Sequence, residues 1–165
     1  MERKDNLGLK GKYTLEILRK DGSVELVNID NSLSNAGKTA VLDIMFNSAT
    51  QITNWYTGII DNSGYTGIDL VNDTMASHSG WTEFTSYDET TRVQWSPGAS
   101  ASQSSSNSTA MVFNVNATGT LKGMFIVSSS TKSGTAGTLF SMALFASTVS
   151  VVNGDQFKIT YTVSA

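Results

Sequence analysis

Two short segments of alternating polar and apolar residues flank an Asp-Gly pair near the start of the chain. Residues 12–19 and 24–29 each follow the period of two that places successive side chains on opposite faces of a β-strand. Between them, Asp21 and Gly22 form the residue pair that tight hairpin turns favour. The pattern therefore predicts an antiparallel β-hairpin.

Similar short segments continue from Trp55 onward, separated by turns rich in Gly, Ser and Asn. Residues 99–108 are mostly serine and alanine, and we expect them to form an exposed flexible loop within one domain. The pattern indicates a mainly β fold, an antiparallel β-sandwich that is either jelly-roll or immunoglobulin-like, because strand order does not follow from strand count. The strands are predicted at residues 55–60, 81–87, 92–95, 111–115, 119–127, 137–146 and 156–163.

One helix is predicted, at residues 35–46. Ser34 or Asn35 can cap its first turn, because a short side-chain oxygen accepts hydrogen bonds from free backbone amides. Asn47 and Ser48 end the run. We expect the apolar face to pack across one end of the sheet, with a partner-binding face as the alternative. The apolar residues at helical spacing are Ala36, Ala40, Val41, Ile44 and Met45.

Length and composition exclude several classes of protein. The 165 residues suit a single domain, which we place at residues 12–165 after an N-terminal arm of residues 1–11. Cysteine is absent, so disulfides and cysteine-ligated zinc are excluded. The net charge of -3 does not indicate a nucleic-acid partner. No apolar run approaches the roughly 20 residues that a membrane helix needs, and residues 1–6 do not resemble a secretory signal.

The candidates for chemistry are few. His78 is the only histidine, so one chain cannot form a His-His metal site. A triad of His78, Asp73 and Ser77 or Ser79 can be written, but residues this close in sequence rarely reach the required geometry. We therefore expect His78 to be hydrogen-bonded within the loop before residue 81, and we expect neither an enzyme nor a bound cofactor.

Three other patterns are also interpreted as structural. Residues 35–39 match the last part of the phosphate-binding loop motif, Gly-Lys-Thr. The motif also requires an earlier glycine, and this chain has Leu33 at that position. Asp61, Asp69 and Asp73 lack the spacing of a calcium loop and are expected to be solvated turn residues. A sugar-binding platform is the alternative to core packing for the tryptophans, which lie in or beside predicted strands. These are Trp55, Trp81 and Trp95.

Beyond these local patterns, an ordered set of segments resembles a family of small virion proteins of tailed bacteriophages. The set covers most of the chain, and each segment alone is a weak signal. It comprises the hairpin, residues 31–37, the helix at 38–46, and residues 55–60, 73–83, 87–92, 131–139 and 153–155.

The resemblance implies a non-enzymatic structural protein, located in the virion and assembled in the host cytoplasm. The expected function is that of a capsid decoration protein, which binds the outside of the shell and stabilises it. The expected partners are the major capsid protein or other virion proteins and further copies of the same chain, as a homo-oligomer. The alternative is a tail or fibre component that binds a host receptor or carbohydrate.

The charged segment of residues 1–12, with the hairpin after it, is the expected docking region, and a disordered tail at residues 1–10 is the alternative. About half of all charged residues lie in the first 30 positions, and the remainder of the chain is sparsely charged. A compact domain with a distinct charged segment suits attachment to another protein surface. The residues expected to contact the capsid or another partner are Arg3, Lys4, Lys10, Lys12 and Tyr13.

Overall fold

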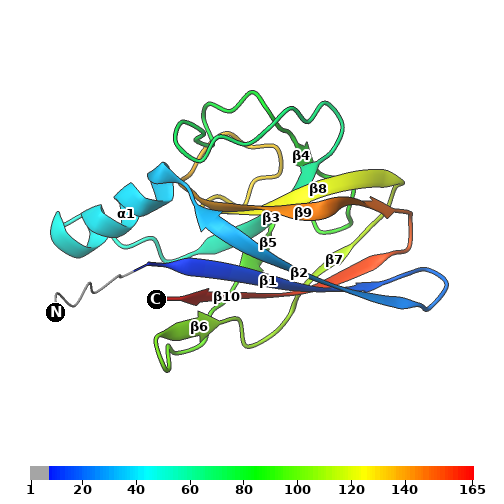
Figure 1. Cartoon of the computed structure of the whole chain (residues 1–165), viewed down its shortest axis with the longest axis horizontal. Helices are drawn as coiled ribbons and strands as arrows, with labels where there is room; N and C mark the ends of the chain where they lie inside the picture. Colours follow the sequence, from blue (N-terminus) through cyan, green and yellow to red (C-terminus); the bar gives the residue numbers. More distant parts are fainter. Residues whose placement is uncertain (1–7) are drawn as a thin grey trace, which may run out of the picture.

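The computed structural model describes residues 8–165, and in this part of the chain it is mainly β, with antiparallel strands and one short helix, as the sequence predicts (Figure 1). Its elements are β1 (Lys10–Leu18), β2 (Val24–Leu33), α1 (Asn35–Phe46), β3 (Trp55–Asp61), β4 (Glu83–Phe84), β5 (Val93–Trp95), β6 (Ser104–Ser106), β7 (Met111–Asn114), β8 (Gly119–Val127), β9 (Leu139–Val151) and β10 (Gln156–Ser164).

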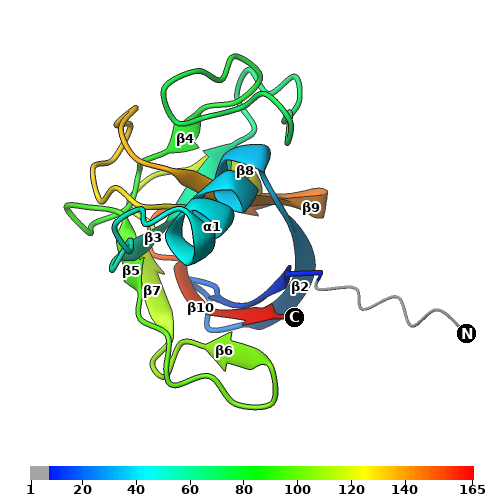
Figure 2. The same ribbon diagram turned by 90° about the vertical axis from the view of Figure 1, so that its left-hand side faces the viewer.

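The strands form one antiparallel sheet that curls until its two halves face each other, as in a β-sandwich (Figure 2). Its strand order is β4-β3-β8-β9-β2-β1-β10-β6, with β5 paired to β3 and β7 paired to β10. We call β1, β2, β6, β7 and β10 the β1 layer, and β3, β4, β5, β8 and β9 the β8 layer. Strand β2 connects the two, because its last residues, Ser32 and Leu33, pair with β9.

The predicted hairpin is confirmed. Strands β1 and β2 pair in register from Gly11 opposite Asn31 to Leu18 opposite Val24. Gly22 has a φ of 86°, a left-handed conformation that glycine adopts without steric cost, and this explains why the turn lies at the Asp-Gly pair. The Arg19 amide donates to the Ser23 carbonyl at 2.8 Å and closes the turn.

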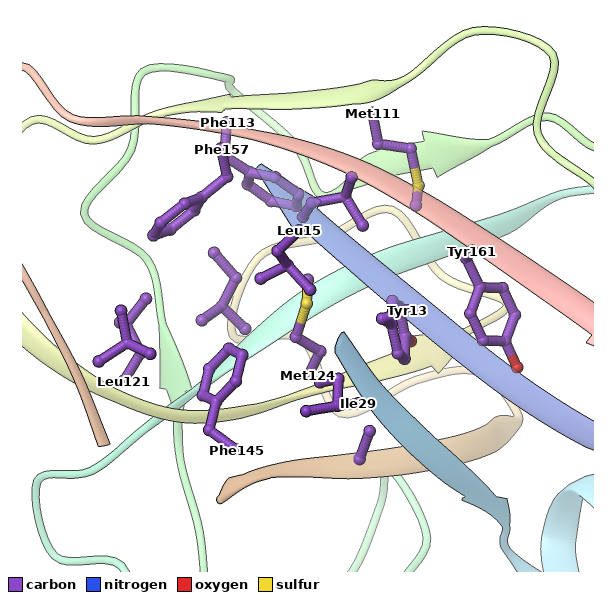
Figure 3. Close-up of a cluster of buried hydrophobic side chains, with 14 of the residues drawn as sticks. Tyr13, Leu15, Ile29, Met111, Phe113, Leu121, Met124, Phe145, Phe157 and Tyr161 are labelled. Atoms are coloured by element: carbon purple, nitrogen blue, oxygen red, sulfur yellow. The ribbon is translucent and has the colours of Figure 1, made fainter. Parts of the chain in front are cut away.

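The main core lies between the two layers (Figure 3). Alternation in β1 and β10 sends every second side chain inward, so that Tyr13, Leu15 and Phe157 meet residues of β8 and β9. Their partners across the core include Met124 and Phe145, which are also almost fully buried. Removal of this apolar area from water is the main force that holds the layers together.

A second, smaller core lies on the opposite face of the β8 layer. Met75 and Trp81, from the long connection between β3 and β4, pack with Phe125 and Met142 of the sheet. The ring centroids of Trp81 and Phe125 are 5.1 Å apart. Because both faces of β8 are covered, its residues 123–127 are all buried, which explains an apolar run without alternation.

One loop prediction and two strand predictions need correction. Residues 99–108 are not only a loop, because Ser104–Ser106 form β6 and pair with the end of β10. The strand expected at residues 81–87 shrinks to Glu83–Phe84, since the chain on either side belongs to the loops. Strand β9 runs on to Val151 instead of ending at residue 146.

Candidate functional site

Part of the apolar face of α1 packs against β9 and the core, as expected, with Val41 partly buried there, but Met45 of that face and two neighbouring apolar residues remain exposed. Leu42, Met45 and Phe46 are 57%, 67% and 81% exposed, and Gly37 is the only helix residue that is buried. Figure 1 shows α1 projecting from one end of the sandwich, the end at which the C-terminus also lies. The helix therefore presents an unpartnered apolar surface.

The first turn of α1 fixes this orientation. The Ser34 hydroxyl accepts a hydrogen bond from the Gly37 amide at 3.0 Å, which is the predicted N-cap, and donates to the Leu139 carbonyl at 2.5 Å. Gly37 lies so close to the backbone of Phe140 that a Cβ atom would be 2.8 Å from its carbonyl carbon. The N-terminal turn is thus held against β9, while the rest of the helix extends beyond the sheet.

A shallow groove continues the exposed apolar surface of α1 toward the start of β1. Leu9, Leu33, Val41 and Leu42 give it an apolar lining, and Lys38 lies at the same site. Leu9 and Val41 are only partly buried against the core. We call the groove together with Leu42, Met45 and Phe46 the α1 surface.

The structure separates the predicted docking residues. Lys10 and Lys12 lie exposed on β1, which begins within the predicted arm, so that residues 10 and 11 belong to the sheet. Tyr13 cannot contact a partner as expected, because its side chain is fully buried and its ring centroid lies 4.4 Å from that of Tyr161. Arg3 and Lys4 lie outside the described residues.

His78 has the structural environment that the sequence predicts. Its Nδ1 is 3.0 Å from the Thr74 carbonyl oxygen, within the same loop, and its ring stacks on Trp81 at a centroid distance of 4.0 Å. Asp73 instead accepts hydrogen bonds from Trp81 Nε1 and from the Asp69 amide. The residues of the conceivable triad are therefore neighbours without the hydrogen bonds that a triad needs.

The tryptophans form no exposed platform for a sugar. Trp81 and Trp95 are 2% and 8% exposed, so the prediction of core packing is confirmed for both. The Trp95 Nε1 donates to the Tyr161 carbonyl at 3.1 Å, and Trp55 is partly buried beside Phe140.

Two of the three aspartates bind their own backbone, whereas Asp73 is buried, which corrects the expectation that it is a solvated turn residue. Asp61 accepts a hydrogen bond from the Ser63 amide, and Asp69 accepts from the amides of Val71 and Asn72. Within residues 8–165, no three His, Cys, Asp or Glu side chains are grouped so that they could hold a metal ion. In the same part of the chain, no helix has the length and apolar character that a membrane crossing requires.

Sequence reasoning missed how the loop of residues 128–138 is anchored to the rest of the molecule. Arg92 is buried and donates to the carbonyls of Ser129 and Gly134, both at 3.0 Å. The same guanidinium is paired with Glu83, which also accepts from the Ser133 amide at 2.7 Å. No local pattern could reveal this arrangement, because it joins three segments that are distant in sequence.

Lys132 fixes the same loop from a second side. Its Nζ lies 2.7 Å from the Tyr87 carbonyl oxygen and 3.7 Å from the centroid of the Tyr87 ring. Desolvation lowers the pKa of the Lys132 amine, and burial raises the pKa of the Tyr87 phenol. The loop is therefore anchored at several points, by Arg92 and Glu83 on one side and by Lys132 on the other.

Comparison with protein-family models finds no match for this chain, and comparison with curated proteins finds none either. Evidence about function therefore comes from the residues themselves and from the surfaces that the fold exposes.

Proposed function

We propose that this protein is a non-enzymatic structural subunit of a tailed-phage virion, a decoration protein that docks on the capsid shell through its α1 surface. The observation that carries the proposal is the apolar stripe of Leu42, Met45 and Phe46, left exposed by the folded chain. The resemblance of the sequence to small phage virion proteins supports the identity of the partner.

The stripe has the character of a binding surface. Its three residues are spaced three and four positions apart, so they share one face of the helix. Full burial of side chains of this size contributes about 1.5–3 kcal/mol each, and an adjacent apolar groove extends the area. Contiguous apolar patches on folded domains mark interaction sites more often than scattered apolar residues do.

Charges near this surface can orient the docked protein. Lys38 lies at the groove, while Lys10 and Lys12 are exposed at the start of the adjacent strand. In a chain with a net charge of -3, lysines at this end favour an acidic surface on the shell. The proposed mechanism is linkage: a protein that binds only the assembled shell stabilises it relative to the free subunits. In this proposal further copies of the chain are present on the same particle, and no cofactor, nucleic acid or membrane takes part.

The location of the protein is tested by gel densitometry of purified virions against empty heads without tails. Hundreds of copies retained on the heads support decoration. A few copies that disappear with the tails contradict it and favour the alternative, a tail or fibre component.

The docking surface is tested on particles that lack the protein. We expect the variant Leu42→Ser/Met45→Ser/Phe46→Ser to fold normally but to lose occupancy, because the changed residues are exposed in the free protein. The matched control is Val24→Ser/Leu26→Ser, which removes exposed apolar residues from β2 near the opposite end of the sandwich. Equal occupancy of the two variants would contradict docking through α1. A separate variant that lacks residues 1–7 measures how much the segment with Arg3 and Lys4 contributes to occupancy on the particle.

A further inference from the structure

The long connection between β3 and β4 forms an open hollow on the outside of the β8 layer. Its volume is about 520 Å³, within the range of roughly 300–1,000 Å³ that small-molecule sites occupy. The lining is predominantly polar and offers hydroxyl, amide, carboxylate and imidazole groups. The polar side chains concerned include Thr66, Asn72, Asp73, Ser77, His78 and Ser79.

Asp73 is the unusual group in this hollow. Its side chain belongs to a residue that is 9% exposed, and one carboxylate oxygen, Oδ2, accepts hydrogen bonds from the Asp69 amide at 2.8 Å and from Trp81 Nε1 at 3.0 Å. The other oxygen, Oδ1, accepts no hydrogen bond from residues 8–165. It is not fully enclosed by the protein, so it can be reached from solvent. Asp73, which lines the hollow, therefore keeps one carboxylate oxygen without a partner among the described residues.

His78 provides a second oriented acceptor. Because Nδ1 lies 3.0 Å from a carbonyl oxygen, the neutral ring carries its proton on Nδ1 and leaves Nε2 free to accept. The ring is held by stacking on Trp81, at an interplanar angle of 17°, and Trp81 is in turn held by Asp73. Trp81 thus contacts both residues, and contacts of this kind restrict their side chains before a ligand arrives, which lowers the entropic cost of binding.

A hydroxyl-bearing ligand suits these groups better than a cation does. Hard cations such as calcium take about six to eight oxygen ligands, several of them carboxylates. Asp69 cannot contribute a free carboxylate, because Oδ1 accepts from two backbone amides and Oδ2 from the Asn72 side chain. Sugar hydroxyls, in contrast, donate to fixed acceptors such as Asp73 Oδ1 and His78 Nε2 and accept from serine, threonine and asparagine side chains.

We propose that the hollow lined by Asp73 and His78 is a binding site for a sugar, with Asp73 Oδ1 and His78 Nε2 accepting hydrogen bonds from its hydroxyl groups. The site lies on the loops that cover the β8 layer, and the α1 surface lies on the helix beyond the end of the sheet. The proposal does not rest on the capsid location, since the isolated protein would bind the sugar as well.

The test is titration of the isotopically labelled full chain, followed by amide NMR shifts, with D-glucose, D-galactose, D-mannose and N-acetyl-D-glucosamine as separate probes. We expect at least one sugar to shift the amides of residues 66–80 in a saturable manner. Calcium chloride and spermidine serve as cationic probes. The proposal is wrong if no sugar of this panel produces such shifts, or if only a cationic probe does.

Three variants locate the site. Asp73→Asn keeps an oxygen that can accept from Trp81 and Asp69 but places an NH₂ group at the open position, and we expect it to weaken binding about tenfold or more. His78→Phe preserves a ring on Trp81 while removing Nε2, and it serves if Asp73→Asn does not fold. Asp61→Asn makes the same chemical change at a turn outside the hollow and should bind normally. Equal affinity in all three variants and the parent chain would overturn the assignment of the site.

Discussion

Arg92 and Glu83 form a doubly hydrogen-bonded ion pair, with Nε–Oε1 at 3.0 Å and Nη2–Oε2 at 2.8 Å, in which the side chains are only 0% and 5% exposed. The guanidinium carbon also lies 5.2 Å from the centroid of the Phe125 ring. The pair lies where β4, β5 and the loop of residues 128–138 meet. Its removal should therefore affect the whole outer side of the β8 layer.

Arg92→Met should destabilise the protein by about 3–5 kcal/mol, because it leaves the Glu83 carboxylate buried without its partner. Urea unfolding followed by circular dichroism measures the change. The matched control is Lys158→Met, which removes an exposed ion pair. Lys158 Nζ lies 3.9 Å from Glu16 Oε1, and both side chains are 44% exposed. Exposed pairs of this kind contribute about 0–1 kcal/mol to stability. Similar losses in both variants would show that the buried pair is not critical.

The double variant Arg92→Met/Glu83→Met distinguishes two contributions to the free energy of unfolding. One is the penalty for a buried charge without a partner, and the other is the net stabilisation by the intact ion pair. We expect it to be more stable than Arg92→Met alone, because it removes both buried charges. A double variant that is even less stable would instead indicate that the hydrogen bonds to the loop of residues 128–138 dominate.

Gly37→Ala should destabilise the protein, although alanine is favoured over glycine by roughly 1 kcal/mol inside a helix. The reason is steric: the added methyl group would collide with the carbonyl group of Phe140 and force α1 away from β9. Overpacking of this kind costs about 1–3 kcal/mol. Thermal unfolding checks the result, with Gly98→Ala as control, because its nearest neighbour would be 3.7 Å away. A higher melting temperature for Gly37→Ala would show that α1 can move without cost.

Local signals account for the parts of the fold that the sequence could predict. The Asp21-Gly22 turn, the Ser34 cap and the limits of β8 depend on neighbours within a few residues, and all three are confirmed. Strand β6 depends on pairing with Thr162 and its neighbours, more than 50 positions away. Its serines carry no strand signal of their own, so sequence alone could not reveal it.

The candidate site was predictable only in part. Tyr13 alternates with Leu15 and Ile17, so its burial could have been inferred from the same pattern that predicted the strand. The exposure of Met45 and Phe46 could not, because an amphipathic helix looks the same whether its apolar face meets its own sheet or another protein. The contact of Asp73 with Trp81 likewise depends on the path of an irregular loop.

Asp155→Asn should reduce the amount of folding stability that the protein loses as the pH falls. Burial alone would raise the pKa of the Asp155 carboxyl, but hydrogen bonds from the amides of Lys20 and Val152 and from Arg19 outweigh it and lower the pKa. A lowered pKa in the folded state contributes stability above the unfolded value of about 3.9, and this contribution is lost as the pH falls through the folded value.

The measurement is urea unfolding of both proteins at neutral pH and at several values below about pH 4. We expect Asp155→Asn to be less stable at neutral pH, because asparagine cannot form the ion pair with Arg19. We also expect the difference between the two proteins to shrink as the pH falls. A constant difference across the series would show that the Asp155 charge does not contribute to the acid sensitivity.

Trp81→Phe should cost more stability than Trp95→Phe, although both substitutions shorten a buried aromatic ring and remove one hydrogen bond. Trp81 Nε1 donates to the Asp73 carboxylate, whereas Trp95 Nε1 donates to the neutral Tyr161 carbonyl. Hydrogen bonds to charged groups contribute about 1.5–3 kcal/mol and neutral ones about 0.5–1.5 kcal/mol. Hydrogen exchange adds a local readout, because Trp81→Phe should speed exchange of the loop amides at residues 66–80 while Trp95→Phe leaves them unchanged. Equal losses of stability, with the loop amides still protected, would show that the hydrogen bond from Trp81 does not hold Asp73 in place. The acceptors of the proposed sugar site would then not be positioned by this contact.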